Sequence, residues 1–127
     1  MSIGMKQLIA DARSQITEID PEAAEHELGQ NPTALALDVR EAEEFSLGRL
    51  PDALLIPRGI LEPKAALDSP ARDSQLSDPE RPIITYCGSG ARSALAAATL
   101  QQLGFSQVRS LAGGFQAWTQ EGRPVVR

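Results

Sequence analysis

The sequence predicts a single α/β domain in which helices cover both faces of a parallel sheet. Two apolar runs, 34–37 and 53–56, are continuous rather than alternating, as expected for strands that are covered on both sides. Segments with helical character separate the apolar runs, and this alternation favours parallel strands joined by crossover helices. A length of 127 residues matches one ordinary domain.

Local signals mark the elements in the first half of the chain. Asp20 and Pro21 begin a helix, because an acidic N-cap precedes proline at the first helical position. Gly29 and Gly48 are expected to end helices, and Pro57 to end a strand. In order, we expect a helix at 2–14, a strand at 15–19, a helix at 21–28, a strand at 34–37, a helix at 41–47, a strand at 53–56 and a helix at 61–67.

The second half of the chain opens with a long connection. Residues 68–82 are polar and carry three prolines, which predicts a surface loop. Gly104 ends an alanine- and leucine-rich helix, and Gly113-Gly114 predicts a tight turn with positive φ. The remaining elements are expected as a strand at 83–86, a helix beginning near Ser93 and running to 103, a strand at 108–111 and a helix at 115–120.

Composition limits the function classes. A net charge of −5 and a pI near 4.8 argue against nucleic-acid or anionic-membrane partners, although a local site for a small anion remains compatible. No run approaches the roughly 20 apolar residues of a membrane span, and the start lacks the apolar core of a signal peptide. A single cysteine forms no internal disulfide, so we expect a cytoplasmic protein. His26 is the only histidine, so we expect no zinc site.

Cys87 is the most informative residue of the chain. It follows the strand at 83–86 and precedes Gly88-Ser89-Gly90-Ala91-Arg92 and a helix start. Closely spaced glycines before a helix let several backbone N–H groups converge on one point, where they stabilise an anion. A thiol at that point ionises more readily. A free cysteine is often only a small buried hydrophobe, but such a cysteine needs neither the Gly-x-Gly nor Arg92, so we interpret Cys87 as a nucleophile.

Several segments together resemble the single-domain rhodaneses, the thiosulfate sulfurtransferases and their relatives. The resemblance covers roughly residues 15–124, and its order and spacing are more specific than any one segment. The segments are Leu37-Asp38-Val39-Arg40 with Glu44-Phe45, Gly48-Arg49-Leu50-Pro51-Asp52-Ala53, Tyr86-Cys87-Gly88-Ser89-Gly90-Ala91-Arg92-Ser93, Leu103-Gly104-Phe105 and Gly113-Gly114-Phe115-x-Ala117-Trp118.

The resemblance implies a five-stranded parallel α/β domain that transfers sulfane sulfur. In that family the loop cysteine takes sulfur from a donor, becomes a persulfide and passes the outer sulfur to a nucleophilic acceptor. Cys87 matches the catalytic position, and the backbone amides from Gly88 to Arg92 match the cradle for the persulfide. No cofactor is implied. The expected donor is a small anion of the thiosulfate or mercaptopyruvate class, and the expected acceptor is cyanide or a thiol, including one on a protein.

Charged and hydroxyl residues near the loop have two interpretations each. Arg92 suits the sulfonate or carboxylate of a donor at the pocket rim; otherwise it pairs with an acid on a neighbouring helix. Arg58 is a candidate second anion contact or a solvated loop charge. Ser89 offers a hydroxyl to the donor or is simply a small loop residue. Ser93 is expected to be an N-cap rather than a catalyst.

Two further segments receive structural interpretations. Asp38 is expected to cap the helix at 41–47, and Arg40 to pair with Glu43 or Glu44. The family commonly has Gly-His-Ile-Pro-Gly-Ala where this chain has Gly-Arg-Leu-Pro-Asp-Ala at 48–53. We interpret that segment as structural. On the domain level, residues 1–14 are expected to form an N-terminal helical extension and 15–127 the rhodanese-like domain.

Two other functions compete with sulfur transfer. Cysteine-dependent phosphatases and arsenate reductases also use a thiolate in a loop closed by arginine, and one phosphatase group shares the rhodanese architecture. Its loop is one residue longer, whereas Arg92 stands five positions after Cys87. A non-catalytic interaction module of the same fold is the other alternative, but such inactive relatives typically lose the cysteine.

Overall fold

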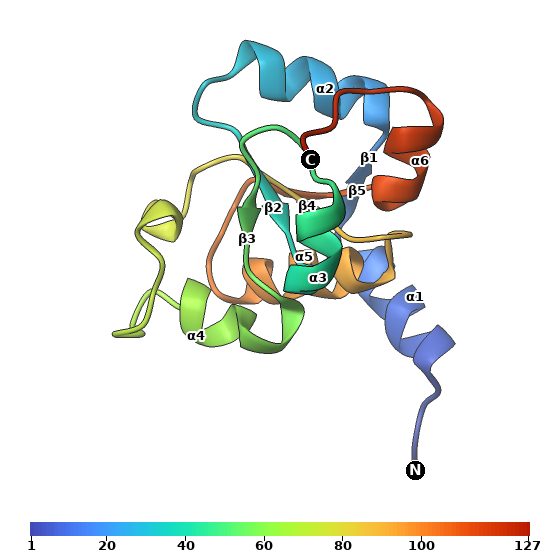
Figure 1. Ribbon diagram of the computed structural model, residues 1–127. Coiled ribbons are helices and arrows are strands. Elements are labelled where there is room, and N and C mark those ends of the chain that lie inside the picture. The colour runs from blue at the N-terminus through green and yellow to red at the C-terminus, as the bar shows by residue number, and fades with distance from the viewer.

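The computed structural model describes residues 1–127 and contains one five-stranded sheet (Figure 1). The strand order is β1-β5-β4-β2-β3, and every neighbouring pair is parallel. This confirms the predicted fold class. The strands are β1 (Thr17–Ile19), β2 (Leu35–Asp38), β3 (Leu54–Leu55), β4 (Ile83–Tyr86) and β5 (Val108–Leu111).

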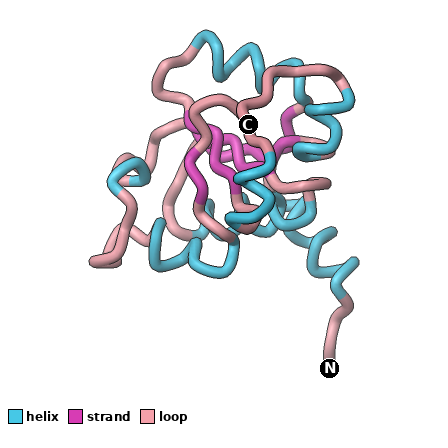
Figure 2. Tube along the Cα trace, in the orientation of Figure 1, coloured by secondary structure: helices cyan, strands magenta, loops and turns pink.

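Helices lie on both sides of this sheet (Figure 2). One face is covered by α2 (Pro21–Gln30) and α6 (Gly114–Gln120). The other is covered by α4 (Leu61–Ala65) and α5 (Ala91–Gln102), with α1 (Met5–Gln15) packed against α5. The short helix α3 (Ala42–Leu47) follows β2, and 3₁₀ turns occupy Arg58–Ile60 and Ser74–Leu76. None of the helices combines the length and the apolar character needed to cross a bilayer.

The buried strands divide the apolar core into two clusters, one on each face. Successive side chains of a strand point to opposite faces. Leu35 and Leu37 of β2 therefore join the cluster beneath α4 and α5, and Ala36 joins the one beneath α2 and α6. Cys87 belongs to the α5 side and Trp118 to the α6 side. This two-sided burial explains why the strands are apolar without alternation.

Several element boundaries differ from the prediction. Helix α2 continues through Gly29, because Gly29 does not take up positive φ and the N–H of Asn31 still bonds the Glu27 carbonyl. Helix α5 begins at Ala91, since Gly90 at φ 111° completes the turn before it. The connection at 68–82 is anchored rather than wholly superficial, because Leu76 is fully buried.

Asp38 and Arg40 form a buried ion pair with each other, which corrects the predicted pairing. Arg40 donates to Asp38 through its backbone N–H, Nε and Nη2, at distances from 2.7 to 3.1 Å. Its Nη2 also donates to the Gly48 carbonyl at 2.7 Å. Helix α3 is capped instead by Glu41, in a capping box with Glu44. The predicted cap by Asp38 and the predicted pair of Arg40 with Glu43 or Glu44 were therefore both wrong. The Asp38 carboxylate turns inward, because the buried Arg40 guanidinium needs a counter-charge.

The segment 48–53, which departs from the family pattern, keeps the turn that the second glycine of that pattern would form. Asp52, which replaces the second glycine of that pattern, has φ 59° and is the only non-glycine residue with positive φ. Aspartate tolerates the left-handed region better than most residues. The turn geometry therefore persists without the glycine, which supports a structural role for the segment.

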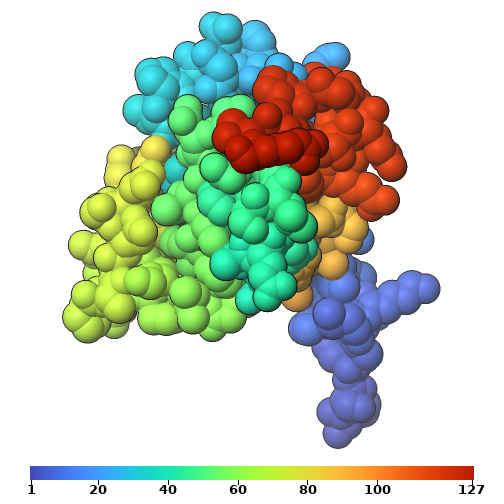
Figure 3. Space-filling view, viewed as in Figure 1, coloured from blue at the N-terminus to red at the C-terminus, as the bar shows by residue number.

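The N-terminal residues extend from the body of the domain. Figure 3 shows the first residues, in blue, projecting away from the rest, and Ile3 and Met5 are 60% and 64% exposed. Helix α1 itself is anchored, because Ala12 is buried where α1 packs on α5. The division into an extension at 1–14 and a domain at 15–127 stays a prediction.

We predict that Asp38→Asn lowers the free energy of unfolding by about 3 kcal/mol or more, because it leaves the Arg40 guanidinium buried without a counter-charge. Urea denaturation followed by circular dichroism measures the loss. Glu62→Gln is the matched control, because it neutralises an acid whose pair with Arg58 is exposed and should cost about 1 kcal/mol or less. Equal losses in the two variants would contradict a structural role for the buried pair.

Candidate active site

Cys87 follows β4 directly, at the carboxyl end of the sheet, and the loop 87–90 leads from it into α5. The cysteine is 1% exposed, and its surroundings on this side are mostly apolar. Two backbone N–H groups nevertheless donate to Sγ, that of Gly90 at 3.1 Å and that of Ser93 at 3.3 Å. The sulfur therefore lies at the base of a loop whose amides turn toward it.

The first turn of α6 fixes the orientation of this loop. The N–H of Phe115 donates to the Cys87 carbonyl at 2.7 Å, and the N–H of Gln116 donates to the Gly88 carbonyl at 2.9 Å. In a trans peptide the carbonyl and the next N–H point in opposite directions. The N–H groups of Gly88 and Ser89 must therefore point away from α6.

Close approach between α6 and the loop requires Gly114. A Cβ at that position would lie 2.6 Å from the Cys87 oxygen and 2.7 Å from the Gly88 oxygen. Gly113 and Gly114 also have φ of 72° and 61°, as the sequence predicted for this turn. The two glycines thus allow the first turn of α6 to approach the loop closely enough to form these hydrogen bonds.

Ser93 completes the contacts of the sulfur. It lies within α5, not at its N-cap, which is Gly90, so the prediction of an N-cap was wrong. Its hydroxyl is 3.5 Å from Cys87 Sγ and 2.8 Å from the hydroxyl of Ser110 on β5. Ser93 and Ser110 are fully buried. Sequence reasoning missed this role because only the packing of α5 on β5 joins the two hydroxyls.

The environment lowers the pKa of the Cys87 thiol. Burial is the largest single influence and raises the pKa. The Ser93 hydroxyl and the N–H groups of Ser93, Gly90 and the neighbouring Ser89 lower the pKa because they can donate to the thiolate, and together they outweigh burial. The thiolate is accordingly favoured by donors that were fixed in place during folding.

Arg92 stands at the rim but is held by an acid on a neighbouring helix. Its Nη1 and Nη2 donate to the two carboxylate oxygens of Glu44 at 2.8 and 3.0 Å. The Arg92 guanidinium is the main cause that lowers the pKa of Glu44 to about 2, so the pair is fully charged at neutral pH. Arg92 Nη2 lies 3.5 Å from the position of a Cβ on Gly88, which keeps the guanidinium beside the loop.

The structure does not bring Arg58 to this cluster. Its guanidinium donates to Glu62 and to the Thr99 hydroxyl at 3.0 Å, far along α5 from the loop. The other predicted site residues lie together: Ser89 is exposed at the tip, and Gly88, Ala91 and Arg92 have backbone N–H groups that donate to no protein acceptor.

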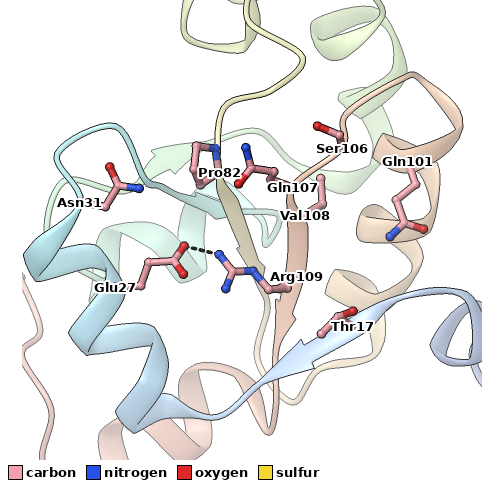
Figure 4. Close-up of a pocket in the computed structure, with 9 residues that line it drawn as sticks. All are labelled: Thr17, Glu27, Asn31, Pro82, Gln101, Ser106, Gln107, Val108 and Arg109. Carbon is pink, nitrogen blue, oxygen red and sulfur yellow. Dashed lines mark hydrogen bonds and ion pairs between the residues drawn. The ribbon is translucent and has the colours of Figure 1, made fainter.

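A polar hollow of about 380 Å³ lies elsewhere on the domain (Figure 4). Its lining includes Pro82 and Gln107, which precede β4 and β5, so it opens at the amino ends of the strands. Its arginine, Arg109, is paired with Glu27. In open parallel sheets, active sites form at the carboxyl ends of the strands. The hollow is therefore separate from the Cys87 site.

The fold and this loop agree with the comparisons to known proteins. The Rhodanese-like domain family matches residues 20–121, and the chain belongs to that family. A sulfurtransferase of Allochromatium vinosum is 36% identical over 111 residues, which cover 87% of this chain and 95% of that protein. The thiosulfate sulfurtransferase GlpE of Actinobacillus succinogenes is 34% identical and covers 86% of this chain and 89% of its own length.

A similar solved structure extends the comparison to the whole chain. It is a protein of unknown function from Rhodopseudomonas palustris CGA009, described as a possible tyrosine phosphatase. It has a TM-score of 0.90 and 30% identity, and the match covers 99% of this chain and 96% of the other. The curated relatives support a sulfurtransferase function in general.

We predict that alkylation of Cys87 titrates at a pH below the ordinary thiol pKa of about 8.5, because only the thiolate reacts and the loop donors favour it. Ser93→Ala removes one of those donors and should move the midpoint to higher pH. Rates of reaction with iodoacetamide from pH 5 to 10 measure both midpoints. Ser106→Ala, an exposed serine outside the site, should leave the midpoint unchanged. A wild-type midpoint at or above that of a free thiol would refute the activation.

We predict that Gly114→Ala destabilises the protein more than Gly122→Ala and also slows alkylation of Cys87. Both glycines have positive φ, 61° and 71°, so both variants incur the left-handed strain of about 1–2 kcal/mol. Only position 114 adds a clash, since nothing lies within 4 Å of a Cβ at 122. Denaturation curves and alkylation rates compare the two. Matching effects would mean that α6 does not set the loop.

Proposed function

We propose that this protein is a sulfurtransferase that moves sulfane sulfur from thiosulfate, or a similar small anionic donor, to a thiophilic acceptor through a persulfide on Cys87. The observation that carries the proposal is the convergence of the Gly90 and Ser93 backbone N–H groups on Cys87 Sγ, with the Ser93 hydroxyl 3.5 Å from the same sulfur. Family membership supports the same chemistry. The similarity to a thiosulfate sulfurtransferase supports thiosulfate as the donor.

In the first half-reaction the Cys87 thiolate attacks the outer sulfur of thiosulfate. A new S–S bond forms, the S–S bond of thiosulfate breaks, and sulfite leaves with the bonding electron pair. One monoanion and one dianion give a persulfide anion and the sulfite dianion, so atoms and charge balance without an added oxidant or reductant. Covalent catalysis divides the transfer into two steps at one site.

The loop suits the persulfide anion that this step creates. The charge moves outward by one atom, from Sγ to the terminal sulfur. The backbone N–H groups of Gly88, Ala91 and Arg92 donate to no protein acceptor and remain for that sulfur. Donors that are already oriented stabilise a developing anion without reorganisation. The proposal needs no metal or organic cofactor for this step.

In the second half-reaction an acceptor attacks the outer sulfur. Cyanide or a thiolate forms a bond to that sulfur, the persulfide S–S bond breaks, and the electron pair returns to Cys87 as the thiolate. A protein thiol fits this role as well as a small one, because Ser89 at the tip of the loop is exposed. The reaction cycle should therefore be ping-pong.

A phosphatase is the second candidate function, favoured by the similarity to the possible tyrosine phosphatase. Arg92 argues against it, because Glu44 occupies both of its terminal nitrogens and a phosphate would have to displace that carboxylate. Incubation with an aryl phosphate tests the alternative. Release of phenol that is lost in Cys87→Ser would replace sulfur transfer by phosphate hydrolysis as the conclusion.

We predict that treatment with thiosulfate adds the mass of one sulfur atom to Cys87 and that a reductant removes it. Cys87→Ser should lose sulfur transfer to cyanide by at least about a thousandfold, because the covalent intermediate cannot form. Peptide mass spectrometry and thiocyanate formation measure the two effects. Ser106→Ala serves as the matched control. An unmodified thiol under both thiosulfate and mercaptopyruvate, with no turnover, would leave only a non-catalytic module of this fold.

A further inference from the structure

Arg13 of α1 reaches the loop from outside the segment that matches the family. A Cβ on Gly90 would lie 3.5 Å from Arg13 Nη2, and the N–H of the same Gly90 donates to Cys87 Sγ. The family match begins at residue 20, so Arg13 has no counterpart within it. Helix α1 holds this position because it packs on α5, with Ala12 buried.

The guanidinium of Arg13 is not committed to a partner. Its only ion pair is with Glu18, where Nε and Oε2 are 3.7 Å apart, too far for a hydrogen bond. The Arg13 and Glu18 side chains are 44% and 39% exposed. Arg92, by contrast, donates to both oxygens of Glu44. Arg13 is thus the cation at this loop whose hydrogen-bond donors remain free.

Together the two arginines flank the tip of the loop. Arg92 lies beside Gly88 and Arg13 beside Gly90, the residues on either side of exposed Ser89. Both guanidinium groups therefore lie close to the loop that holds the sulfur. The chain as a whole has a net charge of −5, so attraction of an anion must come from such local charges.

We propose that Arg13 binds the anionic group of the sulfur donor, the sulfonate of thiosulfate or the carboxylate of a mercaptopyruvate-type donor. This inference rests on the proposed function. Attack by a thiolate on a dianion brings like charges together, and a guanidinium beside the loop offsets the repulsion. Its planar set of donors also matches a sulfonate or carboxylate oxygen pair. Helix α1 thereby contributes a specificity residue to the site.

Kinetics of Arg13→Gln with thiosulfate test the proposal. The KM should rise about three- to tenfold while kcat changes less than about twofold, because the contact binds donor in the ground state and transition state alike. Arg13→Lys should recover part of the loss. Lys6→Gln is the matched control, since it removes the same charge from the same helix two turns away and should leave KM unchanged. A KM in Arg13→Gln equal to that of Lys6→Gln would overturn the proposal.

A second measurement does not depend on sulfur transfer. Iodoacetate is anionic and iodoacetamide is neutral, so the ratio of their alkylation rates at Cys87 reports positive charge near the sulfur. Arg13→Gln should lower this ratio about threefold or more relative to wild type, Glu18→Gln should raise it, and Lys6→Gln should not change it.

The two measurements separate the failure of each proposal. If wild type forms no persulfide but Arg13→Gln still lowers the alkylation ratio, the proposed function is refuted. The anion site at Arg13 is then supported, for an anionic substrate other than a sulfur donor. If persulfide forms normally and neither KM nor the ratio responds to Arg13→Gln, the sulfurtransferase stands and the role of Arg13 is refuted.

Discussion

The site depends on the two hydrogen bonds by which the start of α6 holds the carbonyls of Cys87 and Gly88. These bonds fix the direction of two carbonyl groups. Because the peptide bonds are trans, they also fix the direction of the N–H groups of Gly88 and Ser89. A loop of small residues has no side chains to hold its own shape. Its geometry is therefore imposed by a helix that lies next to it only in the folded domain, and Gly114 makes the approach possible.

Most charged side chains around the site form ion pairs, and these pairs have different structural roles. Asp38 and Arg40 are buried and connect the end of β2 to Gly48, so their pair belongs to the framework. Glu44 has two roles, because one of its oxygens accepts both the N–H of Glu41 at the helix start and a donor of Arg92. The cap of α3 thus also fixes the arginine at the rim. Arg13 is the exception among these charges, because its guanidinium donates no hydrogen bond within the protein, as our proposal of a ligand-binding role requires.

The likeness to both sulfurtransferases and a possible phosphatase has a physical basis. Each chemistry needs a thiolate at the focus of backbone donors, and an α/β sheet supplies that focus wherever a strand ends before a helix. What differs is the room within the loop and the availability of its arginine. In this protein the arginine at the fifth position after the cysteine is already bound to a carboxylate. A phosphate that used this arginine would have to displace the carboxylate.

Sequence alone determined the succession of strands and helices along the chain, because burial on both faces leaves continuous apolar runs and because proline, glycine and acidic caps act locally. It also singled out Cys87 and its loop, since Gly-x-Gly before a helix has a local physical meaning. The tertiary structure alone decided the partners: Ser93 with Ser110, Arg92 with Glu44, Asp38 with Arg40, and Arg13 with the loop. Three of these contacts link different elements of the fold, and the fourth, Asp38 with Arg40, requires both side chains to turn toward the interior. Their hydrogen bonds and close approaches can form only after the sheet and the helices have packed.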